Sequence, residues 1–256
     1  MIKTFNVDIR TSDGAMDCHI AQPDGTGPFA PVILYMDVPG IRQELHDFAA
    51  RIAREGYLCV LPDLYYRNGR VRFDLARGPE ELQRMFAAGS ALTNAMIVSD
   101  TRGILDWLST QAQAKPGGGV IGYCMSGQFV VSVAGHFPDR IRAAASLYGV
   151  RIVTDQPDSP HLLIPRIAGE LYLGFAEHDP YVEDHVIPAL RSELQKHGVR
   201  HTIDIYPGTE HGFCFPQRPA YNEAAAEQAW TAVFEMYQRT LANPDERSCQ
   251  ASAGTD

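Results

Sequence analysis

The chain has 256 residues, of which 45% are hydrophobic and 21% charged, a composition typical of a globular protein with a buried core. Its formal net charge of −9 argues against a general affinity for nucleic acid or for an anionic membrane, since both depend on clustered lysine and arginine. The N-terminus lacks the apolar core of a secretory signal, and no stretch approaches the roughly 20 apolar residues of a membrane helix. We therefore expect a cytoplasmic protein, monomeric or homodimeric, with a single domain over residues 1–242.

The predicted elements alternate along the chain. Two alternating runs, 4–11 and 16–21, flank the turn signal Ser12-Asp13-Gly14 and predict an antiparallel hairpin. Short apolar runs predict strands covered on both faces at 31–36, 57–61, 118–123, 143–148, 171–176 and 201–206. Apolar residues at helical spacing predict helices at 45–53, 97–108, 125–136, 186–197 and 221–241. This order predicts an α/β fold with a mostly parallel central sheet and helices on both faces.

Residues 64–94 interrupt the alternation, with a short helix predicted around 79–88. Because the segment follows the carboxyl end of a strand, where open α/β sheets bind ligands, it is a candidate wall or lid of a site. An equal alternative is a solvated connection without a role. The tail, 243–256, is rich in Ser, Ala, Gly and Asp and is predicted to be disordered.

The stretch Gly119 to Phe129 runs from an apolar strand through small residues into a helix, which is the context of a nucleophile elbow. Gly122 and the small residues Ser126 and Gly127 leave room for a sharp turn with Cys124 at its tip. The N-terminus of the following helix favours a thiolate there. Alternatively, Cys124 is an inert core residue. Ser126 is a weaker candidate nucleophile, because it falls inside the first helical turn.

A thiol nucleophile needs a base and a group that orients the base, and in this kind of fold they follow it in the order acid, then histidine. Asp179 follows the strand at 171–176, and His211 follows the strand at 201–206. Both are therefore expected at the sheet edge where Cys124 lies. The simpler alternatives are a turn or capping role for Asp179 and a surface position for His211.

Asp37 follows the strand at 31–36 at the same edge of the sheet. In this kind of fold, that loop supplies one donor for the oxyanion, and the residue after the nucleophile supplies the other. We therefore predict that the backbone N–H groups of Val38 and Met125 hold the oxyanion. Pro39 has no N–H to donate.

These motifs resemble the dienelactone hydrolase family of the α/β-hydrolase superfamily. The resemblance is carried by Gly122 to Gly127 at the elbow, by Asp179, by Glu210 to Phe213, and by the runs 33–40 and 56–65. It extends over about residues 7–241. It implies hydrolysis of a carboxylic ester, an enol-lactone or a similar bond by a Cys124-His211-Asp179 triad, through an acyl-thioester, with no metal and no cofactor.

The resemblance also implies that Asp37 helps to generate the thiolate, although family members carry a longer glutamate there. Family enzymes that act on anionic dienelactones use arginines, one soon after the catalytic histidine, where this chain has Phe215. We therefore expect a related esterase or lactonase that acts on a small molecule. Candidate substrate-binding residues are Tyr65, Tyr66, Arg67, Tyr123, Phe213 and Arg218.

Two other functions remain open from the sequence. One is a catalytically silent α/β-hydrolase that binds a small molecule, since a fold does not guarantee its chemistry. The other is a thiol redox role in which Cys214 pairs with Cys124. The five cysteines are odd in number and widely spaced, and they match neither a disulfide framework nor a zinc site.

Overall fold

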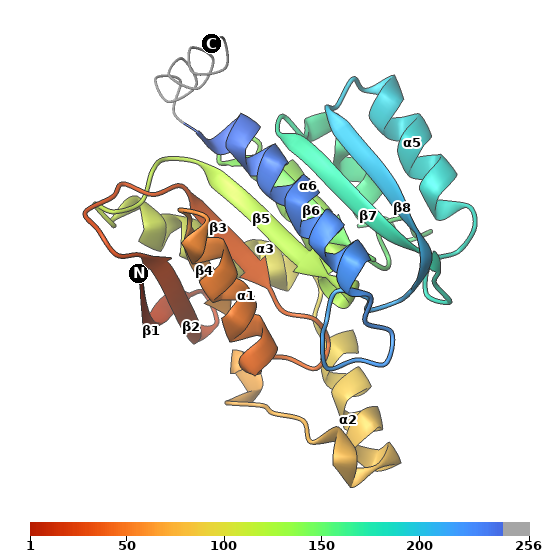
Figure 1. Cartoon of the computed structure of the whole chain (residues 1–256), viewed down its shortest axis with the longest axis horizontal. Coiled ribbons are helices and arrows are strands. Elements are labelled where there is room, and N and C mark those ends of the chain that lie inside the picture. The colour runs from red at the N-terminus through yellow and green to blue at the C-terminus, as the bar shows by residue number, and fades with distance from the viewer. Residues whose placement is uncertain (243–256) are drawn as a thin grey trace.

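The computed structural model describes residues 1–242, and the predicted disordered tail at 243–256 lies outside the described residues. Within this range, eight strands form one sheet in the order β1-β2-β4-β3-β5-β6-β7-β8 (Figure 1). The strands are β1 (Ile2–Thr11), β2 (Gly14–Pro23), β3 (Pro31–Tyr35), β4 (Leu58–Pro62), β5 (Gly118–Tyr123), β6 (Ile141–Leu147), β7 (Glu170–His178) and β8 (His201–Glu210).

β2 pairs antiparallel with both β1 and β4, and every other pairing in the described sheet, beginning with β4 and β3, is parallel. In the β1–β2 hairpin, Ile9 lies opposite Met16 and Val7 lies opposite Cys18. Ile9, Met16 and Cys18 are buried, as expected when alternate side chains face the core. The predicted hairpin is therefore confirmed, and each of its strands is longer than the sequence pattern indicated.

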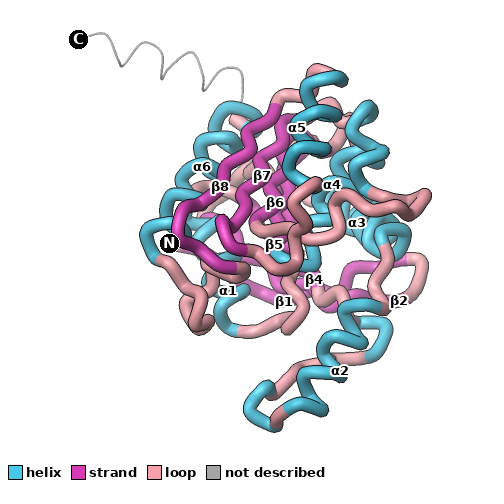
Figure 2. Tube along the Cα trace, turned by 90° about the vertical axis from the view of Figure 1, so that its right-hand side faces the viewer, coloured by secondary structure: helices cyan, strands magenta, loops and turns pink. Residues whose placement is uncertain are grey.

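In the described part of the chain, five α-helices cover the sheet on its two faces. In Figure 2, α1 (Gln43–Arg54) and α6 (Glu223–Leu241) lie on one side of the strands, and α3 (Asn94–Ser109), α4 (Gly127–His136) and α5 (Val186–Lys196) lie on the other. The predicted α/β architecture is confirmed. Within residues 1–242, none of the helices is both long and apolar enough to cross a membrane.

The amphipathic pattern places each helix on the sheet. In α1, Leu45, Phe48, Ala49 and Ile52 are buried at the spacing of one helical face. Two helices begin at capping residues of the expected type. The side chain of Thr93 accepts a hydrogen bond from the N–H of Met96 at the start of α3, and that of Asn222 accepts one from the N–H of Ala225 at the start of α6.

Residues 64–94 contain the remaining helix, α2 (Pro79–Ser90), which lies beyond the carboxyl ends of the strands (Figure 1). Pro79 at its first turn suits a helix start, because its missing N–H is not needed there. The segment is fastened to α3 by Arg67, whose guanidinium donates two hydrogen bonds to buried Asp100. This anchor fixes the base of the segment while α2 lies over the carboxyl edge of the sheet.

Candidate active site

Cys124 sits at a strained turn between β5 and a short 3₁₀-helix, Cys124–Ser126, that leads into α4. Its φ of 54° lies in the left-handed region, which a non-glycine residue adopts only where the surroundings impose it. A Cβ on Gly122 would lie 2.9 Å from the carbonyl oxygen of Ser126, and one on Gly127 would lie 2.2 Å from the Cα of Gly149. The two glycines therefore allow the close packing of this turn, which has the geometry of a nucleophile elbow.

Ser126 serves the elbow in a different way. Its side chain is buried, and its Oγ donates a hydrogen bond to the carbonyl of Met36, directly after β3. Cys124, by contrast, is partly exposed and lines the cavity above the sheet. The serine ties the elbow to the neighbouring strand and leaves the cysteine as the side chain presented at the tip.

Asp179 and His211 immediately follow β7 and β8, which pair in parallel and so end at the same edge. The ring Nδ1 of His211 lies 2.8 Å from Oδ2 of Asp179, and the two side chains are 8% and 3% exposed. The backbone N–H of Tyr181 donates to the other oxygen, Oδ1, at 3.0 Å. These contacts fix the carboxylate, which in turn orients the imidazole with Nε2 on its far side.

Two opposing influences set the pKa of His211. Burial lowers this pKa, but Asp179 and the Cys124 thiol outweigh burial and together raise the pKa to about 9. Nε2 of His211 is buried and makes no hydrogen bond within the described chain. The Cys124 thiol therefore raises the pKa of His211 as a neighbouring group in the same cavity. The rings of Tyr148 and Tyr181 pack edge-on against the imidazole, with centroids at 5.0 and 4.8 Å. The result is a confined base beside a thiol.

The two predicted oxyanion donors both line the cavity that contains Cys124. Met125 lies in the first turn of a helix, where N–H groups have no intrahelical acceptor. The Val38 peptide is held from behind, because its carbonyl accepts a 2.6 Å hydrogen bond from the Tyr65 hydroxyl. Tyr65 therefore acts on the site indirectly: it holds the loop that contains Val38, and it is not among the residues that line the cavity.

Asp37 is completely buried and takes part in an ion-pair network. Arg42 donates to both of its oxygens, at 2.5 and 3.1 Å, and Arg218 donates to Oδ2 at 2.5 Å. Arg42 also pairs with Glu44. No described contact joins Asp37 to Cys124, so activation of the thiol by Asp37 stays a prediction. In this structure, the carboxylates of Asp37 and Glu44 together balance the charges of Arg42 and Arg218 beside the site.

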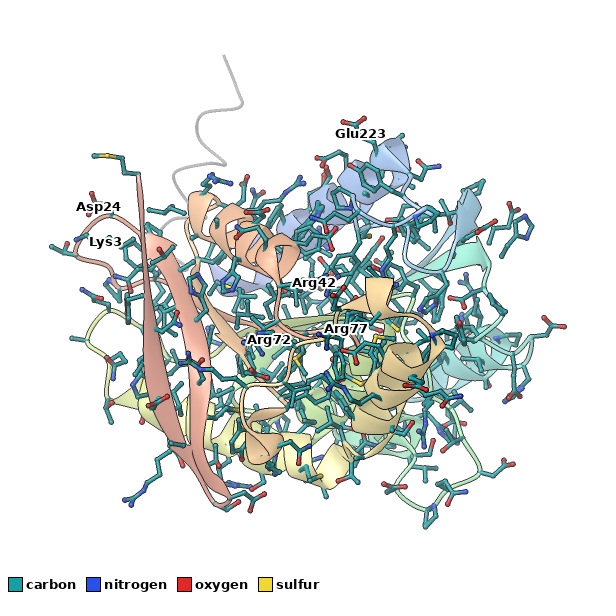
Figure 3. The ribbon with its side chains drawn as sticks, turned by 90° about the horizontal axis from the view of Figure 1, so that it is seen from below. Lys3, Asp24, Arg42, Arg72, Arg77 and Glu223 are labelled. Carbon is teal, nitrogen blue, oxygen red and sulfur yellow. The ribbon has the colours of Figure 1, made fainter. Side chains whose placement is uncertain are left out.

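The cavity at the elbow has a volume of about 400 Å³, within the range of small-molecule sites. Its lining combines Cys124 and His211 with mostly apolar groups from the elbow, from α2 and from the loops after β3, β6, β7 and β8: Val38, Pro39, Met85, Phe86, Gly89, Ser90, Met125, Gln128, Val150, Arg151, Tyr181 and Arg218. Arg42 and Arg72 line a separate, more polar cavity next to it. Both are labelled near the centre of Figure 3, away from the Lys3–Asp24 ion pair on the outer hairpin.

The structure separates the six candidate substrate-binding residues. Arg218 lines the cavity, and Tyr65 supports the Val38 loop from behind. Tyr66 and Arg67 instead contact Asp100 of α3 and are not among the residues that line the cavity. The remaining two, Tyr123 and Phe213, are fully buried in aromatic clusters of the core.

Several lining residues were not anticipated from the sequence. Met85, Phe86 and Gly89 belong to a helix that the sequence predicts, but its pattern does not reveal which face meets the site. Tyr181 follows Asp179 by two residues, and this proximity is a signal that could have identified it. Arg151 is exposed, with a φ of 58°, and its backbone strain is visible only in the structure.

The other described cysteines are buried and free, at positions 18, 59 and 214. Burial raises the pKa of the Cys214 thiol, which makes it a poor partner for thiol exchange. In the part of the chain that the structure describes, no three His, Cys, Asp or Glu side chains gather into a group that could hold a metal ion.

The mixed sheet, the elbow after β5 and the acid and histidine after β7 and β8 together define an α/β-hydrolase fold. The chain belongs to the dienelactone hydrolase family, whose model matches residues 16–241. The predicted family is thereby confirmed over nearly the whole described chain.

Individual proteins agree with this assignment. A Synechocystis sp. protein named as a candidate carboxymethylenebutenolidase is 30% identical over 244 residues, covering 94% of this chain and 98% of its own. A Bradyrhizobium sp. protein named as a candidate 2-oxo-3-(5-oxofuran-2-ylidene)propanoate lactonase is 25% identical, covering 88% and 89%. The crystal structure of a candidate dienelactone hydrolase from Klebsiella pneumoniae has a TM-score of 0.82 at 23% identity, covering 93% and 100%. This last similarity concerns the fold.

Proposed function

We propose that this protein hydrolyses a small carboxylic ester or enol-lactone through a Cys124-His211-Asp179 triad and an acyl-thioester intermediate. The observation that carries the proposal is the buried His211–Asp179 pair, whose Nδ1 and Oδ2 atoms are 2.8 Å apart. The pair lies beside Cys124, which is partly exposed and has a left-handed backbone conformation. A buried base, a group that orients it and a strained nucleophile in one cavity are the parts that acyl transfer requires.

In the first half of the reaction, the Cys124 thiolate attacks the substrate carbonyl carbon and forms a carbon–sulfur bond. The electron pair of the carbonyl moves to oxygen, and the N–H groups of Val38 and Met125 stabilise the oxyanion. When the tetrahedral intermediate collapses, the carbon–oxygen bond to the leaving group breaks. The imidazolium of His211 gives its proton to the departing alkoxide or enolate.

In the second half, neutral His211 removes a proton from water, and the resulting hydroxide attacks the thioester carbonyl. The carbon–sulfur bond then breaks, and the thiolate leaves as the carboxylic acid forms. Asp179 keeps Nδ1 of the imidazole protonated throughout, so that Nε2 is the atom that takes and returns the proton. The named activities of the relatives, carboxymethylenebutenolidase and lactonase, support a reaction of this type.

The test compares wild type with Cys124→Ala and Cys124→Ser on p-nitrophenyl acetate and on a dienelactone, before and after iodoacetamide. The experiment uses a Cys249→Ser background, because Cys249 lies outside the described residues and the other three cysteines are buried. We expect both Cys124 variants and the alkylated protein to lose at least 10³-fold in kcat. Intact mass after rapid quenching of the wild type should reveal an acyl adduct on Cys124.

Two outcomes would contradict the proposal. Full esterase activity in Cys124→Ala would remove this cysteine from the mechanism. Thermal stabilisation of wild type by lactones, with no turnover on any ester, would instead support the catalytically silent binding protein that the sequence also allows.

A further inference from the structure

Helix α2 meets the predicted oxyanion residues at its C-terminal turn. Met85 and Gly89, four residues apart, lie on one face of α2 and are both buried. A Cβ on Gly89 would lie 2.5 Å from Cγ2 of Val38 and 3.1 Å from Sδ of Met125, so no larger residue fits without displacing them. The end of α2 is therefore in direct contact with the residues expected to hold the reacting carbonyl.

On an adjacent face of α2, apolar side chains continue from the cavity to the surface of the protein. Phe86 lines the cavity together with Cys124, yet the phenylalanine is 46% exposed. Leu82 lies one turn earlier on the same face and is 42% exposed. Large apolar side chains that stay exposed next to a cavity often mark a binding surface. Met85, Phe86 and Leu82 thus form a continuous apolar strip, which we call the α2 wall, from the elbow to the surface.

The charges of the cavity lie on other elements. Arg218 is paired with Asp37, and Arg151 comes from the loop after β6. Within its described lining the cavity has no acidic side chain. Apart from the hydroxyl of Ser90 at the end of the helix, a substrate group beside α2 therefore meets carbon and sulfur atoms, and none of the α2 residues that line the cavity is charged. Such a surface favours an apolar substituent, because burial of each methylene group stabilises binding.

We propose that the α2 wall is the substrate-specificity surface of this hydrolase and that it binds an extended apolar chain on the cleaved ester. The proposal rests on the hydrolase function proposed above. Met85 and Phe86 contact the part of the chain nearest the carbonyl, and Leu82 contacts its outer end. The preferred substrates are neutral esters with a chain of several carbons.

The test measures kcat/KM for p-nitrophenyl acetate, butyrate, hexanoate and octanoate, and for the matching alkyl acetates, so that a chain on either side of the ester bond is examined. In one of the two series, kcat/KM of the wild type should rise about threefold per added methylene until the wall is covered. In that series, Phe86→Ser should lower kcat/KM for the six-carbon ester about tenfold, and this loss should be clearly larger than the loss for the shortest ester. Leu82→Ser should lower kcat/KM only for the eight-carbon ester of the same series.

The matched control is Leu162→Ser, which also removes an exposed leucine but lies outside the cavity lining. Its chain-length profile should equal that of wild type. A kcat/KM of wild type that does not rise with chain length in either series, or an equal loss for every ester in Phe86→Ser, would overturn the proposal.

A second measurement separates this proposal from the catalytic one. Cys124→Ala is titrated with neutral methyl ketones that carry a methyl or a hexyl chain, and binding is followed by thermal shift. Stronger stabilisation by the hexyl ketone that disappears in Cys124→Ala/Phe86→Ser supports the α2 wall even if no ester is hydrolysed. Equal stabilisation by both ketones contradicts it.

Discussion

His211 and Asp179 are joined by a 2.8 Å hydrogen bond between Nδ1 and Oδ2, although 32 residues separate them in the chain. The parallel pairing of β7 and β8 brings them together, because each follows the carboxyl end of its strand. Both side chains are nearly inaccessible to water, so the attraction between them is less screened than at a surface. Asp179 should consequently control both the orientation and the pKa of His211.

Asp179→Asn should lower kcat about 10³- to 10⁴-fold with little change in folding, because an amide cannot hold the correct histidine tautomer. It should also lower the pKa of His211, since a partner that raises this pKa is lost. Steady-state kinetics and NMR titration of the imidazole measure the two effects. The control is Asp184→Asn, an exposed position near Asp179, for which we expect wild-type values.

Stability should depend on pH through His211. Its pKa is raised from 6.5 to about 9 in the folded protein, so the group stabilises the fold fully below pH 6.5 and loses this contribution as pH rises through 9. The difference in free energy of unfolding between wild type and His211→Asn should therefore fall by on the order of 2 kcal/mol between pH 6 and pH 10. Urea titrations at pH 6, 8 and 10 measure it. A difference that grows with pH would contradict the raised pKa.

Tyr65→Phe should reduce kcat about tenfold while leaving KM nearly unchanged. The variant removes the hydrogen bond that holds the Val38 carbonyl, so the adjacent N–H is less well placed for the oxyanion. Tyr66→Phe is the matched control, because that hydroxyl contacts Thr11 and Asp100 and does not touch the cavity. It should cost about 1 kcal/mol of stability and leave kcat unchanged. Equal kinetic effects of the two variants would remove the proposed role of Tyr65.

Gly212→Ala should impair catalysis through Arg218. Gly212 has a φ of 94° beside His211, and a Cβ there would lie 2.9 Å from Nη1 of Arg218. The comparison is Gly198→Ala, where φ is also positive, at 64°, but where a Cβ meets nothing within 4 Å. Both variants should lose about 1–3 kcal/mol of stability from backbone strain. Only Gly212→Ala should also lose activity, and a parallel loss in both would show that strain alone is responsible.

The sheet and its helices could be predicted because the apolar spacing records which faces are buried. Runs such as 31–36 and 118–123 are apolar throughout and form β3 and β5, covered on both faces. Asp179 and His211 could be placed as well, because carboxyl ends of parallel strands meet at one edge. Cys124 could be placed from the small residues around it.

The partners of several predicted residues could not be found in this way. Tyr65 and Tyr66 are adjacent in sequence, but Tyr65 turns to Val38 and Tyr66 to Asp100. Asp37 contacts Arg218 across 181 residues. Such pairs leave no periodic trace in the sequence, because a single long-range contact needs no repeating pattern.

By itself, then, the sequence determined the order of strands and helices, the elbow at Cys124 and the edge of the sheet at which Asp179 and His211 lie. These features follow from local periodicity and from the geometry of parallel strands. Only the tertiary structure decided that Asp37 is neutralised by arginines and that α2 supplies an apolar wall beside Val38 and Met125. The reason is physical: the rotation of a helix and the partner of a buried charge are set by how distant surfaces pack, and that packing is resolved only when the whole chain is folded.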